Sequence, residues 1–336
     1  MDTLYFLHLQ IFAVQTTELD DTGNDLSPEM KTFYEKVLLK NLKPNLVHAQ
    51  FGQKKNIPKN GGKTIEFRRF SKLAKATTAL TEGTTPAGNS LDVQTITATI
   101  SQYGDYITIS DLLELTAIDN VIVEALTVLS DQAGETLDTI VRNVLVGGTQ
   151  VIYAPASAGT AVTSRAKLDA TCLFTPDLAY QAARQLKRKN VPKIDGSYIG
   201  IIHPDVSYDV MRSDEWIDIH KYATPENIYE GEIGKLGSVR FVETTEAKIW
   251  KGDGCPTGLA VYGCLFLGAD AYGDTELEGG GLQVIVKQKG SAGTADPLDQ
   301  RSSVGWKSSK VAERLSEERI VRVECCSSMS ATAEAN

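Results

Sequence analysis

The sequence IPKNGGK, from Ile57 to Lys63, places two glycines and a lysine where a phosphate group could be bound. A nucleotide-binding loop of this type needs a further glycine five residues before its Gly-Lys pair, and a helix after it. Residue 57 is an isoleucine, and the residues after Lys63 alternate between polar and apolar as a strand does. We therefore interpret Asn60-Gly61-Gly62 as a tight turn, in which glycine supplies the positive φ angle.

His203, Pro204 and Asp205 form the trio that most resembles a catalytic site, since an imidazole beside a carboxylate can act as a general base. The same residues are expected without chemistry where a buried strand ends and a helix begins with proline and a capping aspartate. The four histidines include no pair at i, i+4, and no Gly-x-Ser-x-Gly sequence occurs. The sequence therefore predicts no catalytic, cofactor-binding or metal-binding residues.

The five cysteines are an odd number, and they lack the spacing of a disulfide framework. Thiols that act as small buried apolar residues are typical of a reducing compartment. Cys325 and Cys326 are adjacent, and we expect one to point into the core and the other out of a strand. A redox pair is the alternative.

Length and composition indicate a globular chain with a real core. The 336 residues are enough for two domains, and 42% of them are hydrophobic. The net charge of −9 argues against attraction of the whole chain to nucleic acid. No apolar run approaches the roughly 20 residues that cross a bilayer. The apolar start MDTLYFLHLQIFAV lacks a basic region, so we expect it to dock on a partner or fold back rather than direct export.

Apolar residues at helical spacing, bounded by capping residues, predict a helix from Ser27 to Pro44 and a longer one near the middle of the chain. The long helix begins at Asp119 or Asn120 and stops at Gly147. At 1.5 Å per residue it would be about 40 Å long, enough to brace a domain. The side chains expected on its core stripe are Ile122, Ala125, Leu129, Ala133, Leu137, Ile140 and Val144.

Residues 63–70 and 91–110 are rich in β-branched side chains and alternate with period two, which predicts two strands. The stretch between them is rich in Thr, Ala and Gly. We therefore predict a long hairpin arm with too little apolar surface to be stable unless it leans on something else. The rest of the chain mixes strands and helices, as in an α+β fold, and the polar residues at its end are expected to fray.

Charge is segregated along the chain. Eight basic residues and one acid occur from Lys54 to Lys75, whereas Ala76 to Val141 contains ten acids and no lysine or arginine. Complementary patches steer association and fix orientation, so we expect the basic arm to dock on the acidic long helix of a neighbouring copy. A merely solvated hairpin is one alternative. A nucleic-acid grip is another, although only Phe67 and Phe70 offer aromatic rings for stacking.

The order of these elements resembles the major capsid protein of tailed phages, which has the Hong Kong 97-like fold. The stretches that carry the resemblance are GKTIEFRRFSKLAKATTALTEGTTPAGNSLDVQTITATISQYGDYITISDLLELTAID, DPLDQRSSVGWK with the following RIVRVE, GSVRFVETTEAKIW and the opening LQIFA. They are similar to the N4-like branch of phage and prophage capsid proteins, from the N-terminus to about Cys325. The resemblance implies an α+β chain with an N-terminal arm, an extended β-hairpin loop, a long spine helix, and peripheral and axial domains.

The resemblance also implies a division of the chain, in which the extended loop lies across an adjacent subunit. Residues 1–50 would form the N-terminal arm and a short helix, 51–110 the extended loop, 111–150 the spine helix of the peripheral domain, 151–281 the axial domain, 282–325 the return to the peripheral sheet, and 326–336 a flexible tail.

The residues expected at contacts between subunits are mainly charged side chains of the arm and the long helix. Trp306 has a second interpretation, as a sheet residue that packs on the spine helix. Arg301 can instead pair with Asp299 of its own chain. The contact candidates are Lys54, Lys55, Lys59, Lys63, Arg68, Arg69, Lys72, Lys75, Asp131, Glu135, Asp138, Arg301 and Trp306.

The resemblance further implies homo-hexamers and pentamers that form an icosahedral shell around phage double-stranded DNA, which the acidic chain would touch only weakly. It implies a portal protein and a separate scaffolding protein as partners, leaves a decoration protein open, and implies no membrane. The shell would assemble in the cytoplasm of the bacterial host and become the capsid of the virion. The alternatives are a soluble α+β enzyme centred on His203 and Asp205, and a nucleic-acid-binding module that uses the Lys54–Lys75 cluster.

Overall fold

The structure is a computed structural model of the chain. It describes residues 46–71, 73–117, 120–156, 159–214, 216, 232–291 and 296–336. Residues 1–45 of the predicted N-terminal region, with its helix, lie outside these residues, as do the contact candidate Lys72 and Asp119 as a helix cap.

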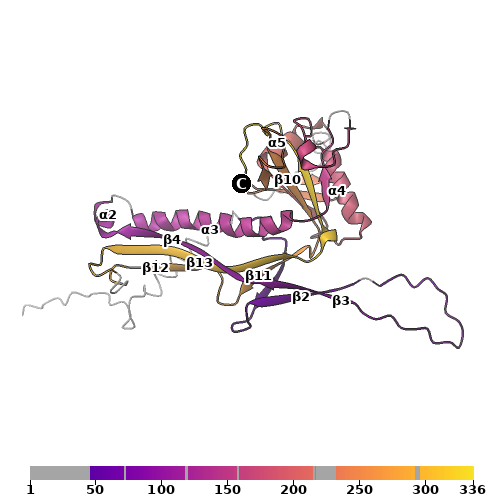
Figure 1. Cartoon of the computed structure of the whole chain (residues 1–336), viewed down its shortest axis with the longest axis horizontal. Helices are drawn as coiled ribbons and strands as arrows, with labels where there is room; N and C mark the ends of the chain where they lie inside the picture. Colours follow the sequence, from indigo (N-terminus) through magenta and orange to yellow (C-terminus); the bar gives the residue numbers. More distant parts are fainter. Residues whose placement is uncertain are drawn as a thin grey trace, which may run out of the picture.

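A five-stranded sheet and one long helix form the first half of the molecule (Figure 1). The central strand, β13, has 14 residues and pairs antiparallel with three other strands along its length. The strand β1 pairs in parallel with β11, on the edge of β11 opposite β13. The bounds of these strands are β1 Gln53–Ile57, β4 Ser101–Ser110, β11 Tyr272–Leu277, β12 Gln283–Lys287 and β13 Arg301–Arg314.

The helix α3, Val121–Val146, lies along β4 and β13 and spans about 39 Å at 1.5 Å per residue. The side chain of Asn120 caps it by accepting a hydrogen bond from the backbone N of Val123. Four residues of the predicted core stripe are buried, from Ala125 to Leu137. The other three, Ile122, Ile140 and Val144, are half-buried. The buried face continues instead through Leu126, Val141 and Leu145. A short helix, α2 (Asp111–Thr116), precedes α3 and has no buried residue.

A seven-stranded sheet covered by helices forms the second half. Its middle strand, β10, is buried along its whole length, as expected for a strand with both faces covered. The strands in spatial order are β5 Val151–Tyr153, β14 Ile320–Cys325, β10 Val261–Leu267, β6 Tyr198–Ile202, β8 Val239–Glu243 and β7 Glu232–Leu236, with β9 Ile249–Trp250 beside β10. The helices of this half include α4 Pro176–Arg188 and α5 Pro204–Met211, with the short 3₁₀ turns η3 Arg165–Lys167 and η5 Glu317–Arg319.

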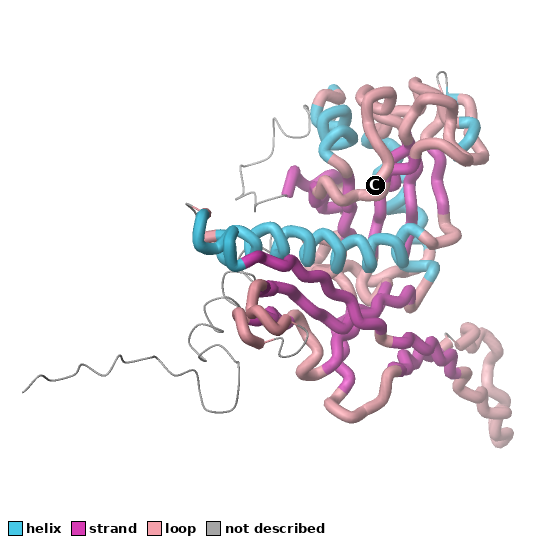
Figure 2. The backbone as a smooth tube through the Cα atoms, turned by 60° about the vertical axis from the view of Figure 1, so that its left-hand side comes forward, coloured by secondary structure: helices cyan, strands magenta, loops and turns pink. Residues whose placement is uncertain are grey.

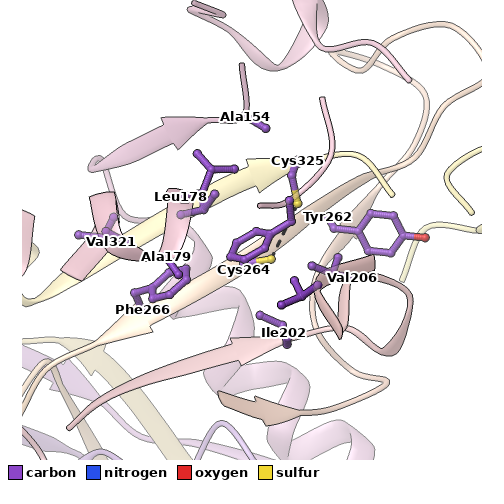
Figure 3. Close-up of a cluster of buried hydrophobic side chains, with 14 of the residues drawn as sticks. Ala154, Leu178, Ala179, Ile202, Val206, Tyr262, Cys264, Phe266, Val321 and Cys325 are labelled. Carbon is purple, nitrogen blue, oxygen red and sulfur yellow. Dashed lines mark hydrogen bonds between the residues drawn. The ribbon is translucent and has the colours of Figure 1, made fainter. Parts of the chain in front are cut away.

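The core of the second half lies between this sheet and the helices, as Figure 3 shows for Leu178 and Ala179 of α4 beside Phe266 and Val321. All five cysteines are free. The prediction that one of Cys325 and Cys326 points outward is wrong, because both are buried. Burial raises the pKa of Cys326 to about 11, which makes a reactive redox pair an unfavourable interpretation.

The division of the chain between the two halves differs from the predicted boundaries. Strand β11, expected in the axial domain, belongs to the five-stranded sheet, and β14, expected in the peripheral sheet, belongs to the seven-stranded one. The reason is long-range pairing: β11 pairs with β13, and β14 lies between β5 and β10. The chain therefore crosses between the halves more often than the sequence suggested.

The end of the chain is packed rather than frayed, so this prediction is also corrected. Ser327 and Ser330 are buried. The Ser328 hydroxyl donates to Asp209 Oδ1 of α5 at 2.6 Å, and Asn336 Oδ1 accepts from the backbone N of Ile249 at 3.0 Å. Small polar side chains can thus hold a chain end when backbone and carboxylate partners lie opposite them.

The predicted hairpin is present as a separate two-stranded sheet of β2 (Thr64–Phe70) and β3 (Val93–Thr99). Its alternation is confirmed, since Phe67 and Ala98 are buried while their neighbours face outward. The turn before it is also confirmed, with positive φ angles at Asn60 and Gly62. The second predicted strand is divided at Ile100: β3 pairs in the hairpin and β4 in the large sheet.

Candidate functional site

The hairpin arm, defined here as residues 64–99, projects from the body of the molecule in both views (Figures 1 and 2). The described residues of the connection between β2 and β3 are exposed, except Ser71, which is half-buried. Several large apolar side chains of the arm face solvent: Phe70 is 61% exposed, Leu73 50%, Leu80 77%, Leu91 63% and Val93 43%. Such a concentration of exposed apolar side chains is typical of a surface that another molecule covers.

The base of the arm is fixed to the body through Phe67. Its ring lies so close to β11 that a Cβ atom on Gly273 would come within 2.5 Å of the ring, so a glycine is needed there. The Lys55 Nζ atom lies 5.1 Å from the centre of the same ring. Arg69 and Glu318 approach to 3.9 Å, but both side chains are partly exposed, so this pair contributes little. The arm is therefore held at its base, and beyond the base the described part of the chain does not cover it.

A cleft of about 590 Å³ lies between the arm base and the body. Its lining carries more positive than negative charge. The basic residues are Lys55, Arg68, Arg69, Lys189 and Arg319, and the acidic ones are Asp270 and Glu318.

The outer face of α3 carries a row of exposed acids, Glu124, Asp131 and Glu135, with the exposed Val128 between them. Partial burial raises the pKa of Glu135, and the nearby Glu246 and Asp131 raise it further. When a cation approaches such a carboxyl group, it stabilises the ionised form that burial and the neighbouring acids disfavour. This row is therefore a suitable surface for a basic partner.

Asp138, predicted as part of this acidic surface, lies inside the molecule instead. Its Oδ1 accepts a hydrogen bond from the backbone N of His48 at 2.7 Å, and its Oδ2 lies 2.5 Å from the His48 Nδ1. Because both side chains are inaccessible, Asp138 cannot contact a neighbouring subunit in this arrangement. Its role is to attach residue 48 to α3.

Trp306 is also removed from the contact candidates. It is 3% exposed, packs among the apolar side chains between the sheet and α3, and its Nε1 donates to Gln132 Oε1 at 3.2 Å. The interpretation as a sheet residue that packs on the long helix is therefore the correct one.

The remaining described candidates keep their access to solvent. Arg301 is 58% exposed, and its Nε lies 3.7 Å from Oδ2 of Asp296. Arg69 is half-buried. The exposed candidates are Lys54, Lys55, Lys59, Lys63, Arg68, Lys75, Asp131, Glu135 and Arg301.

His203 and Asp205 are engaged in holding the fold together. His203, not Asp205 as predicted, caps α5, and its Nδ1 accepts from the backbone N of Asp205 at 3.2 Å. Asp205 Oδ2 accepts from the Tyr262 hydroxyl at 2.6 Å. Burial lowers the pKa of His203, and burial with the Asp205 contact raises that of Tyr262. A neutral imidazole at a helix start and a carboxylate that binds a tyrosine need no catalytic role.

Among the described residues, no group of three or more His, Cys, Asp or Glu side chains is placed to share a metal ion. None of the described helices has the length and apolar character that crossing a membrane requires.

Sequence reasoning missed the strand β1 and the contact between Phe67 and Gly273, which together set the position of the arm. Lys54 and Lys55 of β1 are polar and carry no strand signal of their own. One signal was available, since a glycine inside a strand such as that of Gly273 often marks the close approach of another group.

The fold matches capsid proteins of known structure. The capsid of cyanophage P-SCSP1u aligns over 94% of this chain and 92% of its own, with 16% identity and a TM-score of 0.62. The capsid of Ralstonia phage GP4 aligns over 84% and 88%, with 14% identity and a TM-score of 0.64. That of cyanophage Pam1 aligns over 94% and 99%, with 13% identity and a TM-score of 0.61. At such low identity these likenesses establish the fold alone.

The protein family can be assigned from the sequence. No curated protein matches the chain. The family model described as phage capsid protein matches residues 92–312, which is more than half of the chain and includes α3 and most of both sheets. The chain therefore belongs to the family of phage capsid proteins.

Proposed function

We propose that this chain is the major capsid protein of a tailed phage of the N4-like branch, with the Hong Kong 97-like fold. Copies of it form hexamers and pentamers of an icosahedral shell around double-stranded DNA. The observation that carries the proposal is the hairpin arm, which is fixed at its base and exposes apolar side chains that the described part of its own chain does not cover. Family membership supports the role in a shell.

In this proposal α3 and the five-stranded sheet are the peripheral domain, and the seven-stranded sheet with α4 and α5 is the axial domain. The hairpin arm is the extended loop. The acidic row on α3 and the arm lie on different parts of the subunit, so one copy can offer both to two different neighbours. Such a heterologous contact closes rings when the rotation between copies allows it.

The arm of one copy, together with the adjoining Lys63, docks on the α3 face of the next, with Lys63 and Arg68 opposite Asp131 and Glu135. All four side chains are exposed in the single chain and are available for this pairing. Exposed ion pairs contribute about 0–1 kcal/mol each, so the charges set orientation and rate of association. The apolar side chains of the arm supply most of the stabilisation.

The chain has no catalytic role in this proposal, since His203 and Asp205 already have structural contacts. A portal protein and a separate scaffolding protein are further partners, and a decoration protein is an additional candidate. The acidic chain touches the packaged DNA weakly. The protein assembles in the cytoplasm of the bacterial host and resides in the virion capsid.

A charge-reversal pair tests the docking. The variant Lys63→Glu/Arg68→Glu places acids opposite the acidic row and should abolish assembly, as should Asp131→Lys/Glu135→Lys. The four substitutions combined restore opposite charges and should recover shells, as judged by sedimentation and electron microscopy of the protein co-produced with its scaffold.

The matched control is Lys167→Glu/Lys235→Glu, which reverses two exposed lysines that are not part of α3 and do not line the cleft at the arm base. It should assemble as the wild type does. Assembly of both reversed variants at wild-type yield would refute the proposed docking. A wild-type protein that remains monomeric at high concentration with scaffold would refute the shell function itself.

A further inference from the structure

Three side chains that could carry out a covalent reaction lie together between β11 and β13. The Lys310 Nζ atom is 3.1 Å from Asp274 Oδ2 and 3.6 Å from Glu276 Oε1. Successive side chains of a strand alternate between its two faces, so Asp274 and Glu276 share the face of Tyr272, which packs with residues of α3. An amine and two carboxyl groups thus meet within the sheet itself.

The register of the two strands holds these groups in place. Glu276 is directly opposite Lys310, while Asp274 is opposite Ala312, two residues further along β13. A diagonal neighbour of this kind lies about 7–8 Å away between Cα atoms, a distance that the long lysine side chain can span. Both contacts therefore follow from the strand pairing and need no loop to close.

The amine and one carboxyl group are removed from water. The Lys310 side chain is 3% exposed and that of Asp274 5%, while Glu276 is 47% exposed at the edge of the cluster. Lys310 is the only buried lysine in the part of the chain that the structure describes. The second oxygen of Asp274, Oδ1, has no hydrogen-bond partner there.

The buried surroundings of Lys310 and Asp274 favour the uncharged amine and carboxyl group, which are the forms that react. Burial raises the pKa of Asp274, although the Lys310 ammonium opposes the shift. In a medium of low dielectric constant a neutral amine and a neutral acid become accessible by transfer of one proton. Holding the two in contact also removes most of the entropic cost of bringing them together.

We propose that Lys310 and Asp274 condense to an isopeptide bond within the chain, with Glu276 as the proton carrier. A proton first passes from the ammonium to the Asp274 carboxylate. The Nζ lone pair then attacks Cγ of Asp274, and Glu276 accepts a proton from Nζ and returns it to the departing hydroxyl oxygen. The C–O bond breaks, one water molecule leaves and the Nζ–Cγ amide remains, so Glu276 is unchanged and no oxidant or reductant is needed.

The bond would link β11 and β13, the two strands with which all other strands of the five-stranded sheet pair. β11 holds β1 and the Gly273 contact that anchors the arm, and β13 holds β4, β11 and β12. The inference concerns a single subunit and does not rest on the proposed shell.

Mass spectrometry of the purified full chain tests the bond. The wild type should be lighter than its sequence by one water molecule, and a trypsin digest should contain one branched peptide that joins the Asp274 and Lys310 segments. An intact mass equal to that of the sequence, with separate peptides, after prolonged incubation of the folded protein would refute the proposal and leave a buried ion pair.

Variants identify the reacting groups. Lys310→Arg keeps the charge but offers a guanidinium that does not react, so the mass deficit should disappear. Glu276→Gln leaves the Lys310–Asp274 contact in place and should slow bond formation about 100-fold, as expected for loss of a proton carrier. Lys307→Arg, three residues away on β13, is the control and should retain the deficit. If Glu276→Gln forms the bond at the wild-type rate, the role of Glu276 is refuted.

Discussion

At the scale of the residue, two aspartates of α3 differ completely in their exposure to solvent. Asp131 and Asp138 are seven residues apart, close to two helical turns, and so lie on nearly the same face. Asp131 is exposed, whereas Asp138 is fully buried under residues near His48. Both were predicted as surface acids. The difference arises from a contact between residues 90 positions apart, which a local pattern cannot contain.

Replacing Asp138 should therefore destabilise the protein where replacing Asp131 does not. Asp138→Ala leaves the buried N–H of His48 without its acceptor, which we expect to lower the free energy of unfolding by about 1–3 kcal/mol. Asp131→Ala is the matched control on the same helix and should change it by less than about 0.5 kcal/mol. Urea denaturation followed by circular dichroism measures both, and equal effects would contradict the buried contact.

At the scale of the element, the hairpin arm meets the body at its base, where Phe67 and Ala98 are buried. Phe67 of β2 lies against Gly273 of β11, and the rest of the two-stranded sheet makes its hydrogen bonds within itself. A two-stranded sheet is marginally stable alone. The base contact therefore decides how well ordered the arm is in an isolated subunit.

Gly273→Ala should loosen the arm, because the added methyl group would overlap the Phe67 ring. Overpacking of this kind costs about 1–3 kcal/mol. Hydrogen exchange of the β2 and β3 amides should accelerate, while amides of the second half keep their rates. Gly88→Ala, at a site with open space around it, is the control and should leave the exchange unchanged. Unaltered exchange in both variants would argue that the arm is anchored elsewhere.

Elements with a regular period were predictable from the sequence, and elements defined by a partner were not. The repeat of apolar residues in α3 and the alternation of β2 and β3 are local, and both elements are present. β1 is polar and becomes a strand by pairing with β11, more than 200 residues later. The sheets to which β11 and β14 belong were assigned incorrectly for the same reason.

The candidate site was predictable to a similar degree. The charge segregation identified the arm and the outer face of α3, and most of the named side chains are exposed there. Charge alone could not separate Asp138 from its exposed neighbours, and Trp306 needed the structure to place it under α3.

At the scale of the whole molecule, a subunit with an uncovered arm should behave differently alone and among its neighbours. In the free protein, a glutamate-specific protease should cut first after Glu82, in the exposed connection between β2 and β3. In assembled particles this site should be protected, because a neighbour covers the arm. Electrophoresis of timed digests measures the cleavage, and Glu82→Gln confirms the site. Equal cleavage rates in the two states would show that the arm stays uncovered.

The pairing of β4 with β13 has a consequence for how the protein is made. As the ribosome releases the chain from its N-terminus, β4 emerges long before β13, so the five-stranded sheet cannot close until residues 301–314 have emerged. Contacts between residues so far apart in sequence form slowly, and in the meantime the apolar face of α3 is without its cover. A nascent chain of this design is therefore prone to aggregate until β13 has emerged, and shortening it before residue 301 removes the strand with which β4 pairs.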